Sequence, residues 1–432
     1  MAEKRLVSIA MPGLNEEEAI GVGIEQIQKT FARANSDGEI VVCDNGSTEN
    51  SVANREEYGS ISSSLALDTS LRGTVLSPQH TKSTISSHQP FAVIIPARNA
   101  ARTLAACLEA VFLSSVLPAE VVVVNDGSSD PTAEIASRFP CRILEVCLER
   151  GPMPPRLVGA RAAEAPILIF VDADVSVKKD TFERILADFE NPEIHAVTGL
   201  LSREAPVSSF LSHFKNEYMN YIFKRQPSDS RFLYGSVWAI RKECLIFFEP
   251  IDALFGGLVS DSELGLRLRR ENRRILLDHA LEVVHLKEYN LLRLLKNDFQ
   301  IPFSFAVLLL AYGLENPVTC EKRFSHVSVG QVLATGLAFM AITGMGLILL
   351  FRHPIFWIQT MSCLSLFYAH WFNFLEKVLK ERGILFTAKS LLFLPLDQAV
   401  MFCGMVTGLI YGHRQKFLRH ALGVLRHRLH RR

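Results

Sequence analysis

The chain has 432 residues, 48% of them hydrophobic, and a formal net charge of +1 at pH 7. This length supports one large domain with additions, or two domains. The near-neutral charge gives no indication of a nucleic-acid partner, so none is expected. Among the eight cysteines there is no C-x-x-C pair, which argues against a zinc or redox site and for reduced thiols.

Residues 1–50 predict a single β-α-β unit. Strands are expected at residues 6–12 and 39–43. A helix is expected between them, because apolar residues recur there at helical spacing: Ile20, Ile24, Ile27 and Phe31. Residues 51–90 are rich in serine and threonine and predict a disordered linker.

The first unit resembles the start of the segment that follows. Residues 39–50 read EIVVCDNGSTEN, and residues 120–131 read EVVVVNDGSSDP. The spacing from Pro12 to Asp44 nearly equals that from Pro96 to Asp126, so the repeat includes a whole β-α-β unit. Only the second copy continues into further strands, and the first is expected to be a partial repeat.

Residues 91–290 alternate between apolar strands and amphipathic helices. Strands are expected at residues 91–96, 120–124 and 166–171, and a helix at 101–112. Its apolar face would be formed by Leu104, Leu108, Val111 and Phe112. Strands that are apolar throughout and separated by helices predict an α/β fold with a parallel sheet covered on both faces.

The C-terminal part predicts membrane helices. The uncharged runs Val329–Phe351 and 354–372 can each cross a hydrocarbon core about 30 Å thick. A third run at 390–411 contains Pro395 and Asp397, so whether it spans is open. The transmembrane region is therefore expected at 326–412. The apolar run 301–314 is too short to span and predicts interfacial helices within 291–325.

Positive charges predict the orientation. Lys322 and Arg323 precede the first span, and Lys377, Lys380 and Arg382 follow the second. The positive-inside rule then places residues 91–290 in the cytoplasm, as part of a multi-pass protein of the inner (cytoplasmic) membrane. A third full span would put the basic tail, residues 413–432, on the outside, which contradicts the same rule.

Three acidic motifs are candidates for chemistry. Asp126 ends a strand and could accept a hydrogen bond from a nucleoside, although N-D-G-S is also a common turn. Asp172 and Asp174 form a D-x-D after another strand, where both carboxylates could face one cation, although many such motifs are surface turns. Asp261 stands at an expected helix start, as a general base or only as a favourable charge near the N-terminus.

Together these motifs resemble glycosyltransferase family 2, the inverting transferases of GT-A fold. The family's opening strand and turn match VIIPARN, with Pro96, Arg98 and Asn99, and its nucleotide-binding acid matches Asp126. The remaining family positions match Arg156 on the sugar side, the Asp172–Asp174 motif, Gly235 in the acceptor loop, Asp261 as base and His285 as a metal-facing histidine.

The resemblance implies a Rossmann-like GT-A sheet at 91–290 and a metal-dependent transfer of one sugar. Pro96, Arg98, Asn99, Asp126, Arg156, Asp172 and Gly235 would bind a nucleotide-diphospho-sugar. Mg²⁺ or Mn²⁺ would be held by Asp174, Asp172 and His285, and Asp261 would be the base. The acceptor would be lipid-linked or a cell-envelope glycan, and membrane lipids would be partners.

Two departures from the family pattern matter. Ser260 replaces the first acid of the Glu-Asp pair, while Asp261 keeps the position of the base. The Q-x-x-R-W pattern of processive members is absent, which favours transfer of a single sugar. Two alternatives stay open: a sugar nucleotidyltransferase, although 93–104 lacks a glycine-rich phosphate loop, and a degenerate transferase acting as a membrane scaffold, although Asp172, Asp174 and Asp261 are intact.

Overall fold

The computed structural model divides the chain into two units, Met1–Ile85 and Ser86–Arg432, each described here by itself. It describes residues 7–13, 38–44, 89–148, 151–248, 259–312, 323–324 and 327–429. The helix expected between the N-terminal strands and most of the expected linker lie outside the described residues. In the first unit, β1 (Val7–Gly13) and β2 (Gly38–Asp44) pair in parallel.

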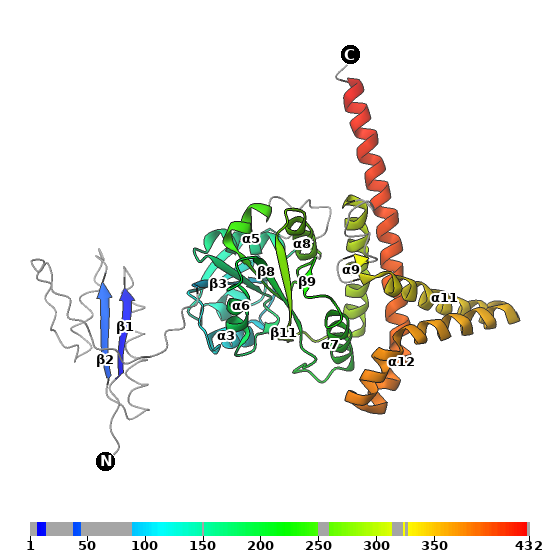
Figure 1. Ribbon diagram of the computed structural model, residues 1–432, viewed down its shortest axis with the longest axis horizontal. Coiled ribbons are helices and arrows are strands. Elements are labelled where there is room, and N and C mark those ends of the chain that lie inside the picture. The colour runs from blue at the N-terminus through cyan, green and yellow to red at the C-terminus, as the bar shows by residue number, and fades with distance from the viewer. Residues whose placement is uncertain are drawn as a thin grey trace, which may run out of the picture. The chain divides into compact units, whose positions relative to one another are not determined.

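The second unit is built on a nine-stranded mixed sheet with the order β5-β4-β3-β6-β10-β8-β11-β7, to which β9 is added against β11 (Figure 1). Its strands are β3 (Phe91–Ala97), β4 (Glu120–Asp126), β5 (Arg142–Val146), β6 (Ile167–Val171), β7 (Val175–Ser176), β8 (Ile194–Leu201), β9 (Asp229–Ser230), β10 (Val237–Arg241) and β11 (Arg274–His285). Strands β5, β4, β3 and β6 are parallel, whereas β10 runs antiparallel to β6 and β8. The expectation of a parallel sheet is therefore correct for one half only.

Helices cover both faces of this sheet, as expected for an α/β fold. They are α3 (Leu104–Phe112), α4 (Thr132–Ala136), α5 (Met153–Ala162), α6 (Thr181–Asp188), α7 (Phe210–Phe223) and α8 (Ser260–Arg270), with a 3₁₀ helix η2 at Lys242–Phe248. Successive side chains of a strand point to opposite faces. Val93 and Ile95 pack with α3 and α6, whereas Ala92 and Ile94 pack with α5 and α8.

The parallel pairs β1–β2 and β3–β4 share one pairing register. Gly13 lies opposite Asp44 in the first unit, and Ala97 lies opposite Asn125 in the second. Asp44 therefore corresponds to Asn125, so its expected match to Asp126 is wrong by one residue. Because a one-residue shift turns a strand side chain to the other face, the first copy has no acid at the position of Asp126.

Three long apolar helices follow the sheet, where the sequence predicts two spans, a third left open and a shorter interfacial helix. They are α9 (Leu291–Tyr312), α11 (Val329–Phe351) and α12 (Pro354–Leu429), and a short hairpin of β12 (Arg323–Phe324) and β13 (Val327–Ser328) precedes α11. By length and composition, segments of all three can cross a membrane: Leu291–Ala311, Val329–Phe351 and Pro354–Arg414. Helix α9 is longer than the apolar run 301–314 indicated, because it begins at Leu291 with the mixed segment LLRLLKNDFQ, whose buried residues include Leu294 and Asp298.

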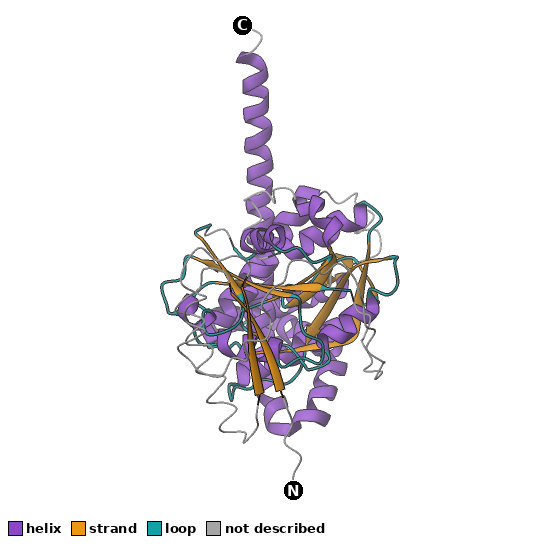
Figure 2. Cartoon of the chain, turned by 90° about the vertical axis from the view of Figure 1, so that its left-hand side faces the viewer, coloured by secondary structure: helices purple, strands orange, loops and turns teal. Residues whose placement is uncertain are grey.

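Helix α12 is two helices joined at Gly383, whose φ of 79° breaks the α-helical geometry. We call residues 354–382 α12a and residues 384–429 α12b. Helices α11 and α12a form a hairpin that points away from the catalytic domain, whereas α9 and α12b run crosswise to it (Figure 1). A second view shows α12b upright again, so the crosswise arrangement does not depend on the viewing direction (Figure 2).

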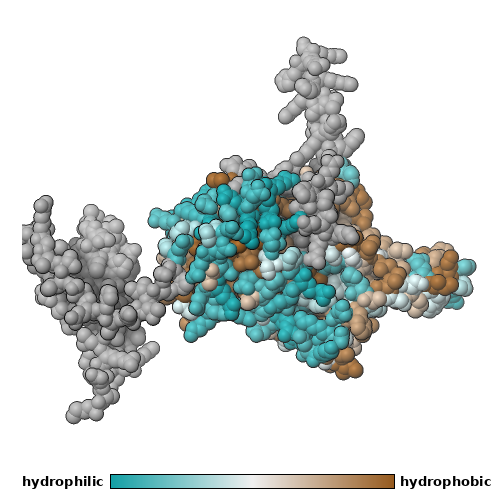
Figure 3. Space-filling model, in the orientation of Figure 1, coloured by the Kyte–Doolittle hydropathy of each residue, from teal (hydrophilic) through white to brown (hydrophobic). Residues whose placement is uncertain are grey.

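The hairpin has an apolar outer surface. Leu349, Leu350 and Ile358 are 80%, 75% and 67% exposed. In the space-filling view the surface of the sheet domain is mostly hydrophilic, and hydrophobic residues gather on the helices beyond it (Figure 3). Apolar surface of this extent is stable in a lipid environment, which supports membrane association.

Helix α7 attaches the catalytic domain to the hairpin. Phe214, Tyr218 and Ile222 pack in one buried cluster with Trp371 and Phe374 of α12a. The join is therefore a continuous apolar core, which fixes the membrane helices relative to the sheet.

Candidate functional site

The carboxyl ends of the parallel strands β4, β3 and β6 lie side by side, where open α/β sheets bind ligands. After β3, Asn99 has a φ of 51°; its backbone N–H donates to Ser128 Oγ at 2.9 Å, and its Oδ1 accepts from the N–H of Ser129 at 2.8 Å. Of the residues predicted to bind the nucleotide sugar, Pro96 lies near the end of β3, and Arg98 and Asn99 follow it on a loop that is fastened to the loop after β4.

Asp126 ends β4 and is only 3% exposed. Its Oδ1 accepts a hydrogen bond of 2.6 Å from the backbone N–H of Leu148. The chain turns directly after it at Gly127, whose φ of 62° suits glycine. Asp126 is therefore held at the end of β4 by the segment that follows β5.

Arg156 links two predicted site residues. It lies on α5, is 2% exposed, and its Nη2 donates to Asp172 Oδ1 and, at 3.0 Å, to the carbonyl oxygen of Gly235. Burial raises the pKa of Asp172, and the positive charge of Arg156 partly opposes this. Buried beneath the site, Arg156 holds the end of β6 against the Gly235 loop.

Asp174 and His285 meet because β7 pairs antiparallel with the end of β11. Nε2 of His285 lies 3.6 Å from Oδ2 of Asp174, and Nζ of Lys287 lies 3.9 Å from the same oxygen. Burial opposes ionisation of Asp174, but hydrogen bonding and charge from His285, with the charge of Lys287, outweigh it and lower its pKa to about 2. Asp174 is therefore ionised at neutral pH.

Asp261 lies in the first turn of α8 and faces Gly235. A Cβ added to Gly235 would stand 3.0 Å from Oδ2 of Asp261 and 3.5 Å from Nη2 of Arg156. Burial raises the pKa of Asp261 to about 6, against the opposing charge of Arg156 and a hydrogen bond from the N–H of Ser262. A carboxylate with such a pKa is mostly ionised at pH 7 and still basic enough to take a proton.

These residues surround one cavity of about 610 Å³, whose lining includes Arg156, Asp172, Asp174, Gly235, Asp261 and His285. Pro96, Arg98, Asn99 and Asp126 are not part of its lining and stand at the neighbouring strand ends. The structure thus brings six of the ten predicted residues to one cavity and leaves four beside it. Glu263, two residues after Asp261, does not line it and binds Arg267 at 2.6 Å.

A divalent cation fits part of the predicted donor set. Within the described parts of the chain, no three His, Cys, Asp or Glu side chains form a group that could hold a metal ion. Asp174 and His285 nevertheless offer one oxygen and one nitrogen to a cation, because Oδ2 of Asp174 lies 3.6 Å from Nε2 of His285. Two protein ligands are sufficient where substrate phosphates and water supply the others.

Two residues of the site were not predicted. Lys287 approaches Asp174, and the i, i+2 spacing after His285 in VVHLKE was an available signal, because such residues of an extended segment share a face. Tyr234 borders the cavity beside Gly235, and burial raises the pKa of its hydroxyl. No pattern in the sequence distinguished Tyr234 from a core aromatic residue.

Residues 92–247 match the family described as Glycosyl transferase family 2. The chain carries a family 2 glycosyltransferase domain. This domain is similar to 4,4'-diaponeurosporenoate glycosyltransferase of Staphylococcus aureus strain N315, with 30% identity over 128 residues, 28% of this chain and 33% of that protein. The chain thus spans about a third of the length of the curated relatives it matches.

Solved structures similar to the family 2 domain have low sequence identity. The mannosyltransferase PcManGT from Pyrobaculum calidifontis, in complex with GDP-Man and Mn²⁺, is 15% identical, covers 75% of this chain and 88% of that one, and has a TM-score of 0.48. The glucosyl-3-phosphoglycerate synthase from Mycobacterium tuberculosis, with Mn²⁺, uridine diphosphate and phosphoglyceric acid, is 16% identical, covers 50% and 77%, and has a TM-score of 0.37.

Proposed function

We propose that the protein is a membrane-bound inverting glycosyltransferase that moves one sugar from a nucleotide-diphospho-sugar to a hydroxyl group of a lipid-linked or glycan acceptor. One observation carries this proposal. Asp261, Arg156 and Gly235 lie within contact distance of one another, and they line the same cavity as Asp172, Asp174 and His285. A base and a site for a diphosphate thus share one space.

The donor would lie across the carboxyl ends of β4, β3 and β6. Asp126 would accept a hydrogen bond from the nucleoside, and Pro96 at the end of β3, with Arg98 and Asn99 of the loop after it, would hold it from the other side. Arg156 keeps the Asp172 carboxylate and the Gly235 loop in place through its two hydrogen bonds. The sugar would then project toward Asp261, where the loop has no side chain to exclude it.

Asp174 and His285 would hold Mg²⁺ or Mn²⁺, with Asp172 as a nearby carboxylate. When bound, the cation would supply charge that stabilises the departing diphosphate. Lys287 lies 3.9 Å from Asp174 and adds a positive charge at the same place. Stabilising the charge on the leaving group is the largest contribution expected from such a site.

Asp261 would act as the general base. The acceptor oxygen forms a bond to the anomeric carbon, the bond from that carbon to the diphosphate oxygen breaks, and its electron pair leaves with the nucleotide diphosphate. The proton of the acceptor hydroxyl passes to Asp261. Attack on the face opposite the leaving group inverts the anomeric configuration.

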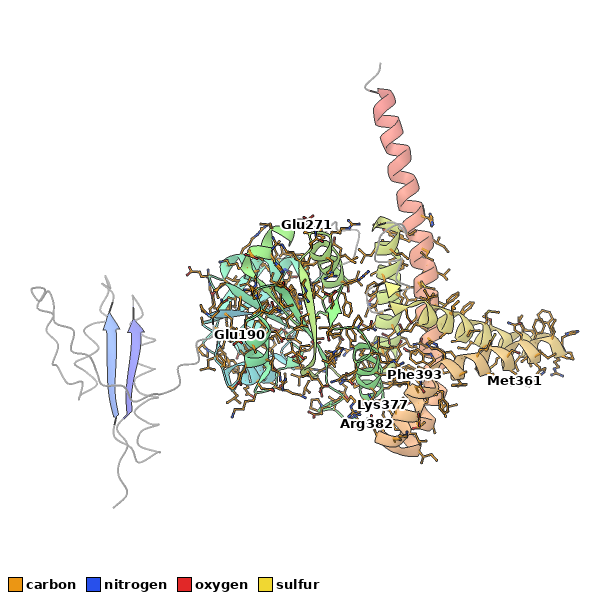
Figure 4. The ribbon with its side chains drawn as sticks, in the orientation of Figure 1. Glu190, Glu271, Met361, Lys377, Arg382 and Phe393 are labelled. Atoms are coloured by element: carbon orange, nitrogen blue, oxygen red, sulfur yellow. The ribbon has the colours of Figure 1, made fainter. Side chains whose placement is uncertain are left out.

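The membrane orientation is also a proposal. Lys377 and Arg382 lie where α12a meets the sheet domain, and Met361 lies far out along the hairpin (Figure 4). Arg382 Nε donates to Oε1 of the buried Glu217 on α7 at 2.7 Å. Basic residues at this end support a cytoplasmic catalytic domain with a hairpin that crosses the inner membrane.

The crosswise α9 and α12b would lie along the membrane surface. Such an arrangement leaves the basic tail on the cytoplasmic side, and the positive-inside rule is then satisfied throughout.

The deciding experiment uses the full-length protein, purified in lipid nanodiscs, with a panel of nucleotide sugars and membrane-lipid acceptors. We expect the wild type to release nucleotide diphosphate with one of the donors, and only when a divalent cation is present. The variant Asp261→Asn should release none. Nuclear magnetic resonance of the product should show the inverted anomer. Release of pyrophosphate from a sugar phosphate and a nucleoside triphosphate would instead support a nucleotidyltransferase. A protein that neither turns over nor binds a nucleotide would support a scaffold.

A further inference from the structure

The cavity that holds Asp261 extends beyond the sheet domain into the membrane helices. Its far walls are faces of α9, α12b and the first turns of α11. On α9 these wall residues are Asn297, Asp298, Ile301, Pro302, Phe305, Ala306 and Leu309, and on α12b they are Gln398, Met401, Met405 and Leu409. The spacing on each helix is helical, so each presents one continuous face to the cavity.

Along both helices, the face that lines the cavity is polar at one end and apolar over the rest. Each begins with polar residues, Asp298 or Gln398, and is apolar from there to Leu309 or Leu409. Eleven residues of helix correspond to about 16 Å at 1.5 Å per residue. The apolar part is therefore long enough to accompany a chain of many carbon atoms.

Close packing of the two helices makes this wall rigid. A Cβ on Gly404 would lie 2.1 Å from the carbonyl oxygen of Phe299, and one on Gly408 would lie 2.4 Å from that of Phe303. Both contacts advance along the two helices together, so α9 and α12b run parallel in contact. Small residues that let helix backbones touch are typical of stable packing in membranes.

The polar end of the α12b face has a buried acceptor without a donor. Gln398 Nε2 donates to the hydroxyl of Tyr218 at 3.4 Å, whereas Oε1 of Gln398 is buried without a partner among the described residues. On α9, Asp298 is paired with Lys215 and shares a side-chain hydrogen bond with Asp397. A buried acceptor without a donor is costly, so Oε1 of Gln398 favours a ligand that carries a hydroxyl group.

Under the proposed function the cavity already accommodates the donor diphosphate with a cation, and its own charges act against a second anion in the head group of the acceptor. Asp172, Asp174, Asp261 and Asp298 contribute four carboxylates to its lining. Arg156 and Lys215 are engaged by carboxylates of this set, and Lys287 stands beside Asp174. A general base at Asp261 is moreover useful only for a nucleophile that carries a proton.

We infer that the acceptor is a membrane lipid with an uncharged, hydroxyl-bearing head, whose apolar chain lies along α9 and α12b while its hydroxyl reaches Asp261. This inference rests on the proposed function and names the acceptor class of the same site. The lipid enters from the bilayer, because α9 and α12b, which form the walls of the far part, lie along the membrane surface in the proposed topology. A lipid alcohol and a glycolipid satisfy this chemistry equally.

A pair of adjacent residues on α12b tests the path of the chain. Leu409 lines the cavity, whereas Ile410 is 64% exposed on the outside of the helix. Leu409→Trp would fill the apolar part, and Ile410→Trp would add the same bulk outside. The probe is a photoreactive long-chain alcohol incorporated into nanodiscs, compared with the same chain ending in a phosphate.

We expect the alcohol probe to crosslink to α9 and α12b in the wild type and in Ile410→Trp, and at least tenfold less in Leu409→Trp. Equal labelling of both variants, or labelling elsewhere, would overturn the path of the chain. Labelling by the phosphate probe as strong as by the alcohol would overturn the choice of head group. Binding of the nucleotide diphosphate is measured in parallel. If the wild type does not bind the nucleotide diphosphate, the proposed function fails. If all three proteins bind it normally, the crosslinking result tests the lipid inference alone.

Discussion

Gly235 and Asp261 are close enough that the loop has no room for one additional methyl group. The Cβ of an alanine at position 235 would stand 3.0 Å from Oδ2 of Asp261, a distance at which the carboxylate must shift by a few tenths of an ångström. The same Cβ would approach Nη2 of Arg156 at 3.5 Å. The position of the proposed base therefore depends on a glycine in the facing loop.

Gly235→Ala should lower kcat by roughly 10- to 100-fold while the protein stays folded, because a small displacement of a reacting group has a large effect on rate. Steady-state kinetics and a thermal unfolding curve measure both. Gly346→Ala is the matched control, since nothing lies within 4 Å of the Cβ it would add. Full activity in Gly235→Ala would show that Asp261 does not need its present position.

Asp261→Asn keeps the shape of the side chain but removes the proton acceptor. Transfer should fall by roughly 10²- to 10⁴-fold, with donor binding retained. Glu263→Gln is the control, because Glu263 binds Arg267 and does not line the cavity. If Glu263→Gln abolishes transfer and Asp261→Asn does not, the base has been assigned to the wrong acid.

The raised pKa of Asp261 predicts two pH effects. Its base form is lost as pH falls through about 6, so kcat/KM should fall about tenfold per unit below that value. Because the folded pKa lies above the ordinary 3.8, folding becomes less favourable as pH rises from about 4 to about 6, by up to roughly 3 kcal/mol. Asp261→Asn should therefore be more stable than the wild type at pH 7 but not at pH 4, as denaturant titrations at both pH values would reveal.

Asp174→Ala should remove the metal-dependent part of nucleotide diphosphate binding. Calorimetry with and without Mn²⁺ would measure it, and a chelator should reproduce the effect in the wild type. The surface residue Asp180, which pairs with Arg184 at 2.6 Å, provides the control variant Asp180→Ala. Unchanged metal dependence in Asp174→Ala would exclude this residue as a ligand.

Removing residues 1–88 should leave transfer intact, because β3 supplies the domain with its own first strand. The first copy also has no acid at the position of Asp126. Donor KM and kcat of the full-length and shortened proteins are compared at equal folded concentration. A loss of more than about tenfold, equivalent to about 1.4 kcal/mol, would mean that the first copy contributes to the site.

Single cysteines at His353 and His413, in a background without the eight native cysteines, test the membrane topology. An impermeant thiol reagent should label His353→Cys from outside the cell and His413→Cys only after permeabilisation. A cysteine restored at position 147, which is exposed in the catalytic domain, marks the cytoplasmic side. Labelling of both histidine positions from outside would mean that α12b crosses the membrane.

The sequence predicts the sheet best where strands are continuous apolar runs. β3, β4 and β6 are recognisable because they are buried on both faces. The antiparallel insertion of β10 between β6 and β8 is not, because pairing direction depends on the path of the chain and leaves no local pattern. The acids at the strand ends were identified as candidates, whereas the contact between Gly235 and Asp261 joins two distant segments and required coordinates.

For the apolar helices too, the sequence predicts the extent of an element better than its arrangement in space. Hydropathy defines α11 to the residue, because a spanning helix must be apolar all round. The tilt of α12b against α12a depends on one residue, Gly383, and on packing against α9, which hydropathy does not report. The conflict between a third span and the basic tail was visible in the sequence, and the topology that we propose for it rests on the direction of the helices.

The hairpin has a consequence for how the protein reaches its membrane. Helices α11 and α12a are joined by Arg352 and His353 alone, and neither 329–351 nor 354–372 contains a charged side chain. Under the proposed topology these two residues are the only part of the hairpin that must be translocated. The catalytic domain and the tail stay on the side of the ribosome, so the hairpin could enter the bilayer as a single unit after the catalytic domain has folded.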